Sequence, residues 1–233
     1  KAGTYLLEPG LSWNELILAL SAGRGIEQTV TIPEGLALRS IVPMLAREIG
    51  APVESLWAAA RDSAMRRRMQ IPTPDLEGYL FPDTYRFMYG TSAREAVRDM
   101  VRRFEQVWEP AWDARLAAMN MTRHELITLA SIVEKEARLA EERPVISAVY
   151  HNRLRQGMPL QADPTVQYAI GEHRTRVLYK DLRIDSPYNT YRHRGLPPGP
   201  IASPGRASIE AALFPANVPY RYFVAHPDGH HEF

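Results

Sequence analysis

Two glutamates separated by one residue, Glu134 and Glu136, are the first candidates for chemistry in this sequence. They lie near the end of the stretch 122–138, T-R-H-E-L-I-T-L-A-S-I-V-E-K-E-A-R. A helix is predicted there, because Thr122 followed three residues later by Glu125 is a capping-box pattern, and apolar residues then recur at helical spacing. At about 100° per residue, Glu136 projects roughly 50° from the centre of the apolar face and Glu134 roughly 110°. We therefore expect Glu136 inside the apolar stripe and Glu134 at its margin.

A carboxyl group on the apolar face of a helix has two explanations. It can be a general acid, because desolvation raises its pKa toward neutral pH. It can also be a structural group bonded to a neighbouring loop, because a buried carboxyl group is costly unless it is paired, hydrogen-bonded or protonated. Structural ion-pair networks often imitate functional sites, so the helix alone leaves both explanations open for Glu136.

The composition is that of an ordinary globular protein, with 233 residues of which 45% are hydrophobic and 24% charged. A formal net charge of +1 gives no overall field that would draw the chain to nucleic acid or to an anionic membrane. The sequence contains no cysteine, which excludes disulfides, cysteine nucleophiles and thiolate metal sites. No apolar run in it approaches the ~20 residues of a membrane-spanning helix.

The first 70 residues alternate short strands and helices with Pro or Gly turns between them, which is typical of a small α+β module. The Pro-rich stretch 71–74 is the best domain boundary available, so we predict two domains, residues 1–70 and residues 71–233. The elements predicted in the first domain are strands at 5–7 and 29–32, helices at 12–20 and 38–49, and helical structure over 52–70.

The second domain is predicted to be mainly helical. An amphipathic helix is expected over residues 92–118, broken at Pro110, and another over residues 141–156. Asp163, which precedes a proline, is predicted to cap a short helix. Residues 222–225 are predicted to form a late strand in the core.

The stretch 186–208 is too rich in Pro and Gly for regular structure. Such a loop is either disordered or a rigid shaped wall. Because Pro restricts φ, a rigid loop would hold the side chains of Tyr188, Asn189 and Tyr191 in place at little further entropy cost.

Two neighbouring histidines near the end of the sequence, His230 and His231, raise the question of a metal site. Adjacent histidines rarely bind one ion together, and no H-E-x-x-H or comparable spacing supports them. The sequence also contains no Gly-rich phosphate loop, G-x-S-x-G elbow or dinucleotide-binding fingerprint. It therefore predicts neither a metal site nor a bound cofactor.

Four motifs occur along the second domain in the order of a known family. They are L-E-G-Y-L-F-P-D-T-Y, L-A-S-I-V-E-K-E-A, V-Y-H-N-R-L-R-Q-G-M-P-L-Q-A-D-P-T-V-Q-Y and Y-N-T-Y-R-H-R-G-L-P-P-G-P-I-A-S-P-G. Through residues 77–233 the chain closely resembles the endolytic murein transglycosylase family, the MltG or YceG-like proteins. The resemblance implies an α+β fold in which a small LysM-like strand/helix module, residues 1–70, precedes a mainly helical α+β YceG-like catalytic domain, residues 71–233. The likeness of residues 1–70 to the LysM-like part is looser.

The resemblance implies that Glu136 is the catalytic acid. The implied reaction cleaves the β-1,4 bond between N-acetylmuramic acid and N-acetylglucosamine in nascent peptidoglycan strands. Glu136 protonates the glycosidic oxygen and then accepts the proton of the muramic C6 hydroxyl, which attacks C1 and leaves a 1,6-anhydro end; one carboxyl group can act first as acid and then as base. By the same resemblance the glycan cleft is lined by Asn152, Gln161, Asp163, Thr165, Tyr188, Asn189 and Tyr191.

The resemblance also implies a cellular setting. Proteins of this family are bacterial, are anchored in the inner membrane by a single N-terminal helix and act on its periplasmic side. We therefore expect this chain to be the extracytoplasmic part of such a protein, without its anchor and without the C-terminal end of the family pattern. The expected partners are peptidoglycan glycan strands and, by resemblance, penicillin-binding synthases; nucleic acid is not expected, and membrane contact is expected only through the anchor.

Two rival functions remain open. A glycoside hydrolase normally uses two carboxyl groups, so Glu136 with Asp163 as its partner is one alternative. Hydrolysis adds water to the products and transglycosylation does not, so the product mass separates the two. The other alternative is a non-catalytic module that binds cell-wall glycan and in which Glu136 is structural; strand binding without cleavage would favour it.

Overall fold

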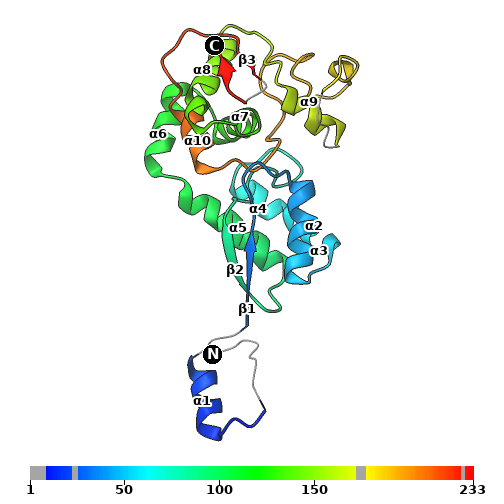
Figure 1. Ribbon diagram of the computed structural model, residues 1–233, viewed down its shortest axis with the longest axis vertical. Helices are drawn as coiled ribbons and strands as arrows, with labels where there is room; N and C mark the ends of the chain where they lie inside the picture. Colours follow the sequence, from blue (N-terminus) through cyan, green and yellow to red (C-terminus); the bar gives the residue numbers. More distant parts are fainter. Residues whose placement is uncertain (1–8, 23–25, 172–176, 227–228) are drawn as a thin grey trace.

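The computed structural model describes residues 9–22, 26–171, 177–226 and 229–233, so the strand predicted at 5–7 lies outside the described residues. The described chain is a mainly helical α+β structure with two small antiparallel sheets. In Figure 1, α1 lies at one end, apart from the rest; α2 to α5 surround β1 and β2 in the middle, and α6 to α10 form the other end. None of the described helices is long and apolar enough to span a membrane.

In chain order the elements are α1 (Trp13–Ala22), β1 (Glu27–Thr31), α2 (Leu38–Ile49), α3 (Val53–Ala60), α4 (Ser63–Arg68), β2 (Thr84–Met88), α5 (Ala93–Val107), α6 (Pro110–Met119), α7 (Arg123–Glu136), η1 (Ala140–Glu142), α8 (Arg143–Arg155), α9 (Asp163–Ile170), η2 (Asp181–Arg183), α10 (Arg206–Leu213), β3 (Val224–Ala225) and β4 (His231–Glu232).

The helices of the first half follow local capping chemistry. The helix predicted at 38–49 is confirmed, and Gly50 ends it in the left-handed conformation with φ 69°. The helical stretch predicted over 52–70 is two helices, because Asp62 caps the second: its Oδ1 accepts hydrogen bonds from the N–H groups of Ala64 and Met65 at 2.9 and 3.0 Å. The predicted break at Pro110 is confirmed, since α5 ends before it and α6 begins there.

Helix α7 is the central helix of the second half and packs against α8, α9 and α10. It begins with the predicted capping box, in which Thr122 Oγ1 accepts from the Glu125 N–H at 3.2 Å and the Glu125 carboxylate accepts from the Thr122 N–H at 2.8 Å. Residues 126–133 are all buried, so the middle of the helix is enclosed on every side. The buried Ser131 hydroxyl accepts a hydrogen bond from the Ile201 N–H at 3.0 Å, which fastens the Pro-rich loop to α7.

One continuous cluster of buried side chains runs from Val30 in β1 to Leu213 in α10. Strand β1 pairs with β2 across the boundary predicted at 71–74, and the Gly35 N–H in the turn after β1 donates to Ser203 O at 2.9 Å. Residues 71–74 are therefore not a gap between separate cores, because the elements before and after them share buried side chains. The division into a LysM-like module and a catalytic domain stays a prediction.

Two smaller predictions are wrong. Asp163 does not cap α9 but is its first residue, with Ala162 at the N-cap position; the Asp163 carboxylate instead accepts a hydrogen bond from the Tyr191 hydroxyl. Residues 222–225 do not form a core strand, because only two of them pair, with the two-residue strand β4, and Val224 is 65% exposed.

Candidate functional site

Glu136 is the last residue of α7 and is partly buried. Its pKa is raised to about 7, first by burial and second by the negative charge of Asp163. The C-terminal end of a helix carries partial negative charge on its free carbonyl groups, which further disfavours an anion at this position. Near neutral pH such a carboxyl group is populated in both protonated and ionised forms, which suits a group that gives up a proton and takes one back.

Two residues one turn apart on α8, Tyr150 and Arg153, lie beside the Glu136 carboxyl group and lower its pKa. The buried Tyr150 hydroxyl lies close to this carboxyl group, and its interaction with the carboxylate favours the ionised form of Glu136. The buried Arg153 is fixed by donating to Leu160 O and Arg221 O, each at 2.6 Å. Sequence reasoning missed both residues, although their three-residue spacing in V-Y-H-N-R on a predicted helix was an available signal.

Asp163 and Tyr191 complete the group of residues that interact with Glu136. The Tyr191 hydroxyl donates to Asp163 Oδ1 at 2.6 Å, so α9 and the Pro-rich loop bring two of the predicted cleft residues together. Burial and the nearby charges of Asp163 and Glu136 raise the pKa of Tyr191, so its hydroxyl stays protonated and remains a donor. We call Glu136, Tyr150, Arg153, Asp163 and Tyr191 the Glu136 site.

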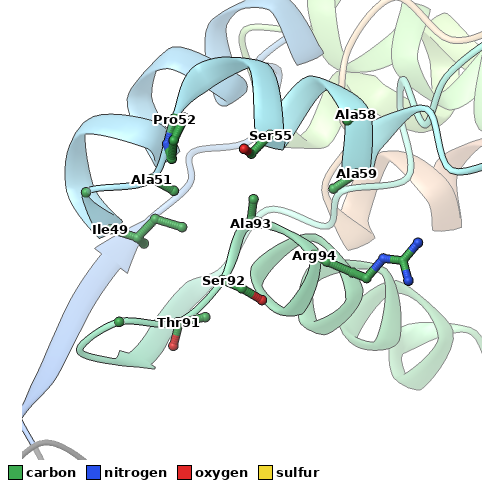
Figure 2. Close-up of a pocket in the computed structure, with 12 residues that line it drawn as sticks. Ile49, Ala51, Pro52, Ser55, Ala58, Ala59, Thr91, Ser92, Ala93 and Arg94 are labelled. Atoms are coloured by element: carbon green, nitrogen blue, oxygen red, sulfur yellow. The ribbon is translucent and has the colours of Figure 1, made fainter.

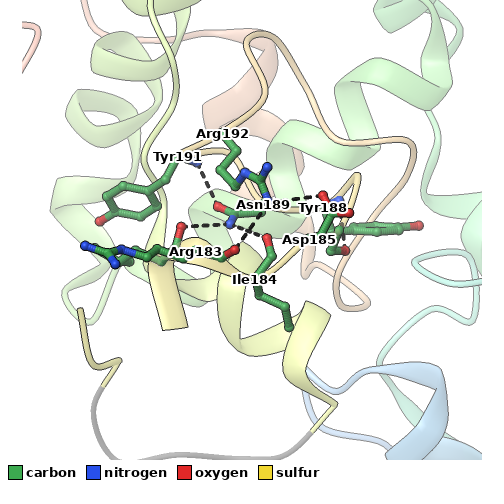
Figure 3. A network of polar contacts seen from close by, with 9 residues as sticks. Arg183, Ile184, Asp185, Tyr188, Asn189, Tyr191 and Arg192 are labelled. Atoms are coloured by element: carbon green, nitrogen blue, oxygen red, sulfur yellow. Dashed lines mark hydrogen bonds and ion pairs between the residues drawn. The ribbon is translucent and has the colours of Figure 1, made fainter. Parts of the chain in front are cut away.

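Asn189 is fully buried and holds the loop that carries Tyr191 (Figure 3). Its Nδ2 donates to Leu182 O and Ile184 O at 3.0 and 2.9 Å, and its Oδ1 accepts from the Tyr191 N–H at 3.0 Å. All of these bonds go to backbone groups. The side chain therefore fixes the loop from behind, and the predicted contact of Asn189 with glycan stays a prediction.

Thr165 and Asn152 also bond within the protein. The buried Thr165 hydroxyl donates to Ala162 O at 2.7 Å, and Asn152 Nδ2 donates to Val218 O and Tyr220 O at 2.9 and 2.6 Å. Thr165 thus fixes the start of α9, and Asn152 holds the C-terminal segment against α8. Neither arrangement tests the predicted role of these residues in glycan binding. Gln161, another residue predicted to line the glycan cleft, lies just before α9; it is exposed and has φ 51°.

Tyr188 belongs to a different group, around the buried carboxyl group of Glu77. Its ring lies 4.8 Å from the ring of Tyr168, and the Tyr168 hydroxyl donates to Glu77 Oε2 at 3.1 Å. Glu77 also accepts from the Leu38 N–H at 2.9 Å, which satisfies the first turn of α2. Burial raises the pKa of Glu77 to about 8. Glu77 therefore joins the start of α2 to α9, and Tyr188 is not brought to Glu136 by these contacts.

Glu134 is not at a solvated margin of α7, because its side chain is only 7% exposed. Its Oε2 accepts from the Gly205 N–H at 3.0 Å, and its Oε1 lies 3.7 Å from Arg143 Nη2. The loop before α10 folds over it, which a helical wheel cannot foresee. Glu134 thus fits the structural explanation of a carboxyl group on α7, whereas Glu136 lies among polar side chains.

The histidine tail and the described acidic residues form no metal-binding group. Among the residues that the structure describes, no three His, Cys, Asp or Glu side chains are placed to hold one ion. His231 instead pairs with Glu142, with 2.6 Å between Nδ1 and Oε2, and this contact holds the C-terminal segment against the start of α8.

A hollow of about 580 Å³ lies away from Glu136, between the α2–α3 turn and the start of α5 (Figure 2). Small and apolar residues line most of it, and its charged lining residue, Arg94, is paired with Asp62 at 2.8 Å. The hollow brings no titratable groups together. We therefore assign no chemistry to it.

The fold is a mainly helical α+β fold, and its Glu136 site holds a partly buried carboxyl group whose pKa is raised to about 7. The YceG-like family matches the chain over residues 1–233. The chain is 38% identical over 245 residues to the endolytic murein transglycosylase of Bacillus subtilis (strain 168), covering 98% of this chain and 68% of that protein. It is 33% identical over 256 residues to the endolytic murein transglycosylase of Streptococcus pneumoniae serotype 2 (strain D39), covering 97% of this chain and 46% of that protein.

A solved structure agrees with these sequence matches. The crystal structure of the YceG-like protein lmo1499 from Listeria monocytogenes aligns with a TM-score of 0.80 at 35% identity, covering 100% of this chain and 81% of that chain. The chain belongs to the YceG-like family.

Proposed function

We propose that this protein cuts peptidoglycan glycan strands internally as a lytic transglycosylase, with Glu136 acting first as acid and then as base. Its family relationship makes it an enzyme of the murein transglycosylase kind. The observation that carries the residue assignment is the state of Glu136: a carboxyl group with a pKa of about 7, at a helix end, among the side chains of Tyr150, Arg153, Asp163 and Tyr191.

In the proposed reaction, protonated Glu136 donates its proton to the oxygen that links N-acetylmuramic acid to N-acetylglucosamine, and the C1–O bond breaks. The ionised Glu136 then accepts the proton of the muramic C6 hydroxyl as that oxygen bonds to C1. The products are a free 4-hydroxyl group and a 1,6-anhydro-muramic end. No water is consumed, and Glu136 ends protonated as it began.

The neighbours of Glu136 support both proton transfers. The charge of Asp163 favours the protonated form of Glu136 before substrate is bound and would stabilise the positive charge that develops at C1. The charge of Arg153 favours the ionised form that exists between the two transfers. Burial is the largest cause of the raised pKa of Glu136, and the two charges act on that pKa in opposite directions.

A two-carboxylate hydrolase is the second candidate, because Asp163 is close enough to Glu136 to raise its pKa. The hydrogen bond from the Tyr191 hydroxyl occupies one Asp163 oxygen and favours an electrostatic role for this carboxylate over activation of water. The mass of the products distinguishes the two reactions.

The cellular part of the proposal follows the family resemblance. The chain acts on the periplasmic side of the inner membrane, as part of a protein held there by an N-terminal anchor, with penicillin-binding synthases as neighbours. Residues 1–70 serve as a LysM-like module beside the catalytic residues of 71–233.

Two matched variants test the assignment of Glu136. Glu136→Gln should lower strand cleavage by at least ~10²–10⁴-fold, because an amide of nearly the same shape cannot donate and retake a proton. Glu134→Gln should cleave at close to the wild-type rate, because that carboxyl group is bonded to the loop before α10. A dead Glu134 variant beside an active Glu136 variant would overturn the assignment.

A further inference from the structure

A hollow of about 320 Å³ opens beside the Glu136 site. Two of its lining residues, Asp163 and Tyr191, belong to the Glu136 site. The charge of Asp163 raises the pKa of Glu136, and the charge of Glu136 raises the pKa of the Tyr191 hydroxyl. The remaining wall comes from Val177, Leu178, Tyr179 and Leu182, a segment without an assigned role. The hollow therefore borders the Glu136 site through Asp163 and Tyr191.

The wall of this hollow exposes an aromatic ring on a fixed backbone. Tyr179 is 90% exposed, so the face of its ring is accessible to a ligand in the hollow. Two hydrogen bonds between Leu178 and Asp181 stabilise the turn that carries Tyr179. The Asp181 N–H donates to Leu178 O at 2.8 Å, and the Leu178 N–H donates to Asp181 Oδ2 at 2.9 Å. The base of the ring is thus held in place before any ligand binds.

Asn189 fastens this wall to the catalytic side of the hollow. It donates to Leu182 O, in the wall. It also accepts from the N–H of Tyr191, as Figure 3 shows. One buried side chain therefore sets the spacing between the apolar wall and the polar pair Asp163–Tyr191. Fixed spacing of this kind lowers the ordering cost of binding a rigid ligand.

We propose that the hollow is a subsite for one N-acetylated sugar ring of the glycan strand, next to the ring that reacts at Glu136, with Tyr179 stacked on its face. A pyranose ring has an apolar C–H face that suits an aromatic ring and a polar edge that suits Asp163 and the Tyr191 hydroxyl. Leu178 and Leu182 provide the apolar contact for the acetyl methyl group. The volume is at the lower end of the ~300–1,000 Å³ typical of ligand pockets, which suits a single ring. This inference rests on the proposed function.

The test measures binding of purified glycan strands, freed of stem peptides, to protein that also carries Glu136→Gln, so that strands stay intact. Tyr179→Ala should weaken binding about 2- to 10-fold, the range expected for one aromatic contact. Tyr179→Phe should bind like the parent, because the ring is retained. Tyr89→Ala is the matched control, since Tyr89 is 56% exposed but lies at the end of β2, and it should have no effect. In otherwise wild-type protein, Tyr179→Ala should raise KM by the same factor and leave kcat nearly unchanged.

Several results would overturn the subsite. Binding by Tyr179→Ala equal to that of the parent would do so, as would an equal loss in Tyr179→Phe, which would assign the contact to the hydroxyl group. A loss seen only with strands that carry stem peptides would mean that the hollow takes peptide instead of sugar. The proposed function stands or falls separately: it fails if wild-type protein releases no fragments, even when Tyr179→Ala weakens binding as expected.

Discussion

Replacing Glu136 by Gln should stabilise the folded protein at neutral and alkaline pH and have little effect at acidic pH. The reason is that the raised pKa of Glu136 records a cost of keeping a charge in this position of the folded state. Gln resembles the protonated acid in shape and carries no charge. The substitution that removes catalysis should therefore also remove a source of instability.

The expected gain in stability follows from the pKa of Glu136. Moving it from 4.5 to about 7 corresponds to about 3 kcal/mol, at 1.36 kcal/mol per pH unit. Glu136 is only partly buried, so this is an upper limit. Below the pKa of the unfolded chain, 4.5, the carboxyl group is protonated in both the folded and the unfolded chain. Between that value and the folded-state pKa of about 7, the folded chain binds more protons than the unfolded chain. The stability of the wild type relative to the variant should therefore decrease as pH rises through this window and stay constant above it.

Urea unfolding of both proteins at several values between about pH 4 and pH 8 measures this difference. The exposed Glu141, replaced by Gln, is the control for removing a carboxyl group outside the site. We expect the Glu136→Gln curve to separate from the wild-type curve with rising pH and the control curve to follow the wild type. A stability difference independent of pH, or a variant less stable than wild type at the alkaline end, would refute the reasoning.

Three further predictions follow from the same structure. Asp163→Asn should move the alkaline decline of kcat to lower pH, because it removes a charge that raises the pKa of Glu136; an unchanged pH–rate profile would contradict this coupling. Gly78→Ala should lower the free energy of unfolding by about 2–5 kcal/mol, because at φ +83° its Cβ would lie 2.4 Å from a proline ring. Gly90→Ala, at φ +81° with open space around it, should lower it by only about 1–2 kcal/mol. Equal losses in urea unfolding would exclude the steric explanation. Glu77→Ala should cost about 2–4 kcal/mol, because it leaves a helix N–H and a tyrosine hydroxyl without their acceptor; a loss below ~1 kcal/mol in thermal unfolding would count against its bridging role.

The elements that could be predicted from the sequence are those decided by neighbouring residues. The capping box at Thr122 and Glu125 sets the start of α7, and Gly50 ends α2, because in both cases a few local groups satisfy the free backbone groups of a helix end. The helical wheel places Glu136 inside the apolar stripe of α7, whereas the structure places it, partly buried, among polar side chains. Its raised pKa depends on burial and on the charge of Asp163, and tertiary packing sets both.

What could not be predicted is decided by contacts between distant segments. The burial of Glu134 depends on a loop about 70 residues further along the chain that donates to it through Gly205. The role of Asn189 was not readable either, because an asparagine in a loop can equally bind a ligand or hold backbone groups, and only its burial favours the second. The shared core across 71–74 required the pairing of β1 with β2, and local turn chemistry carries no information about that pairing.

The central claim is that one glutamate cuts the glycan strand without water. The most direct measurement is the mass of the fragments released from purified peptidoglycan by the wild-type protein, with Glu136→Gln as the blank. We predict fragments with 1,6-anhydro-muramic ends, each lighter by one water than the corresponding hydrolysis product, and none from the variant. Fragments with the mass of hydrolysed ends, or equal release by the variant, would contradict the account.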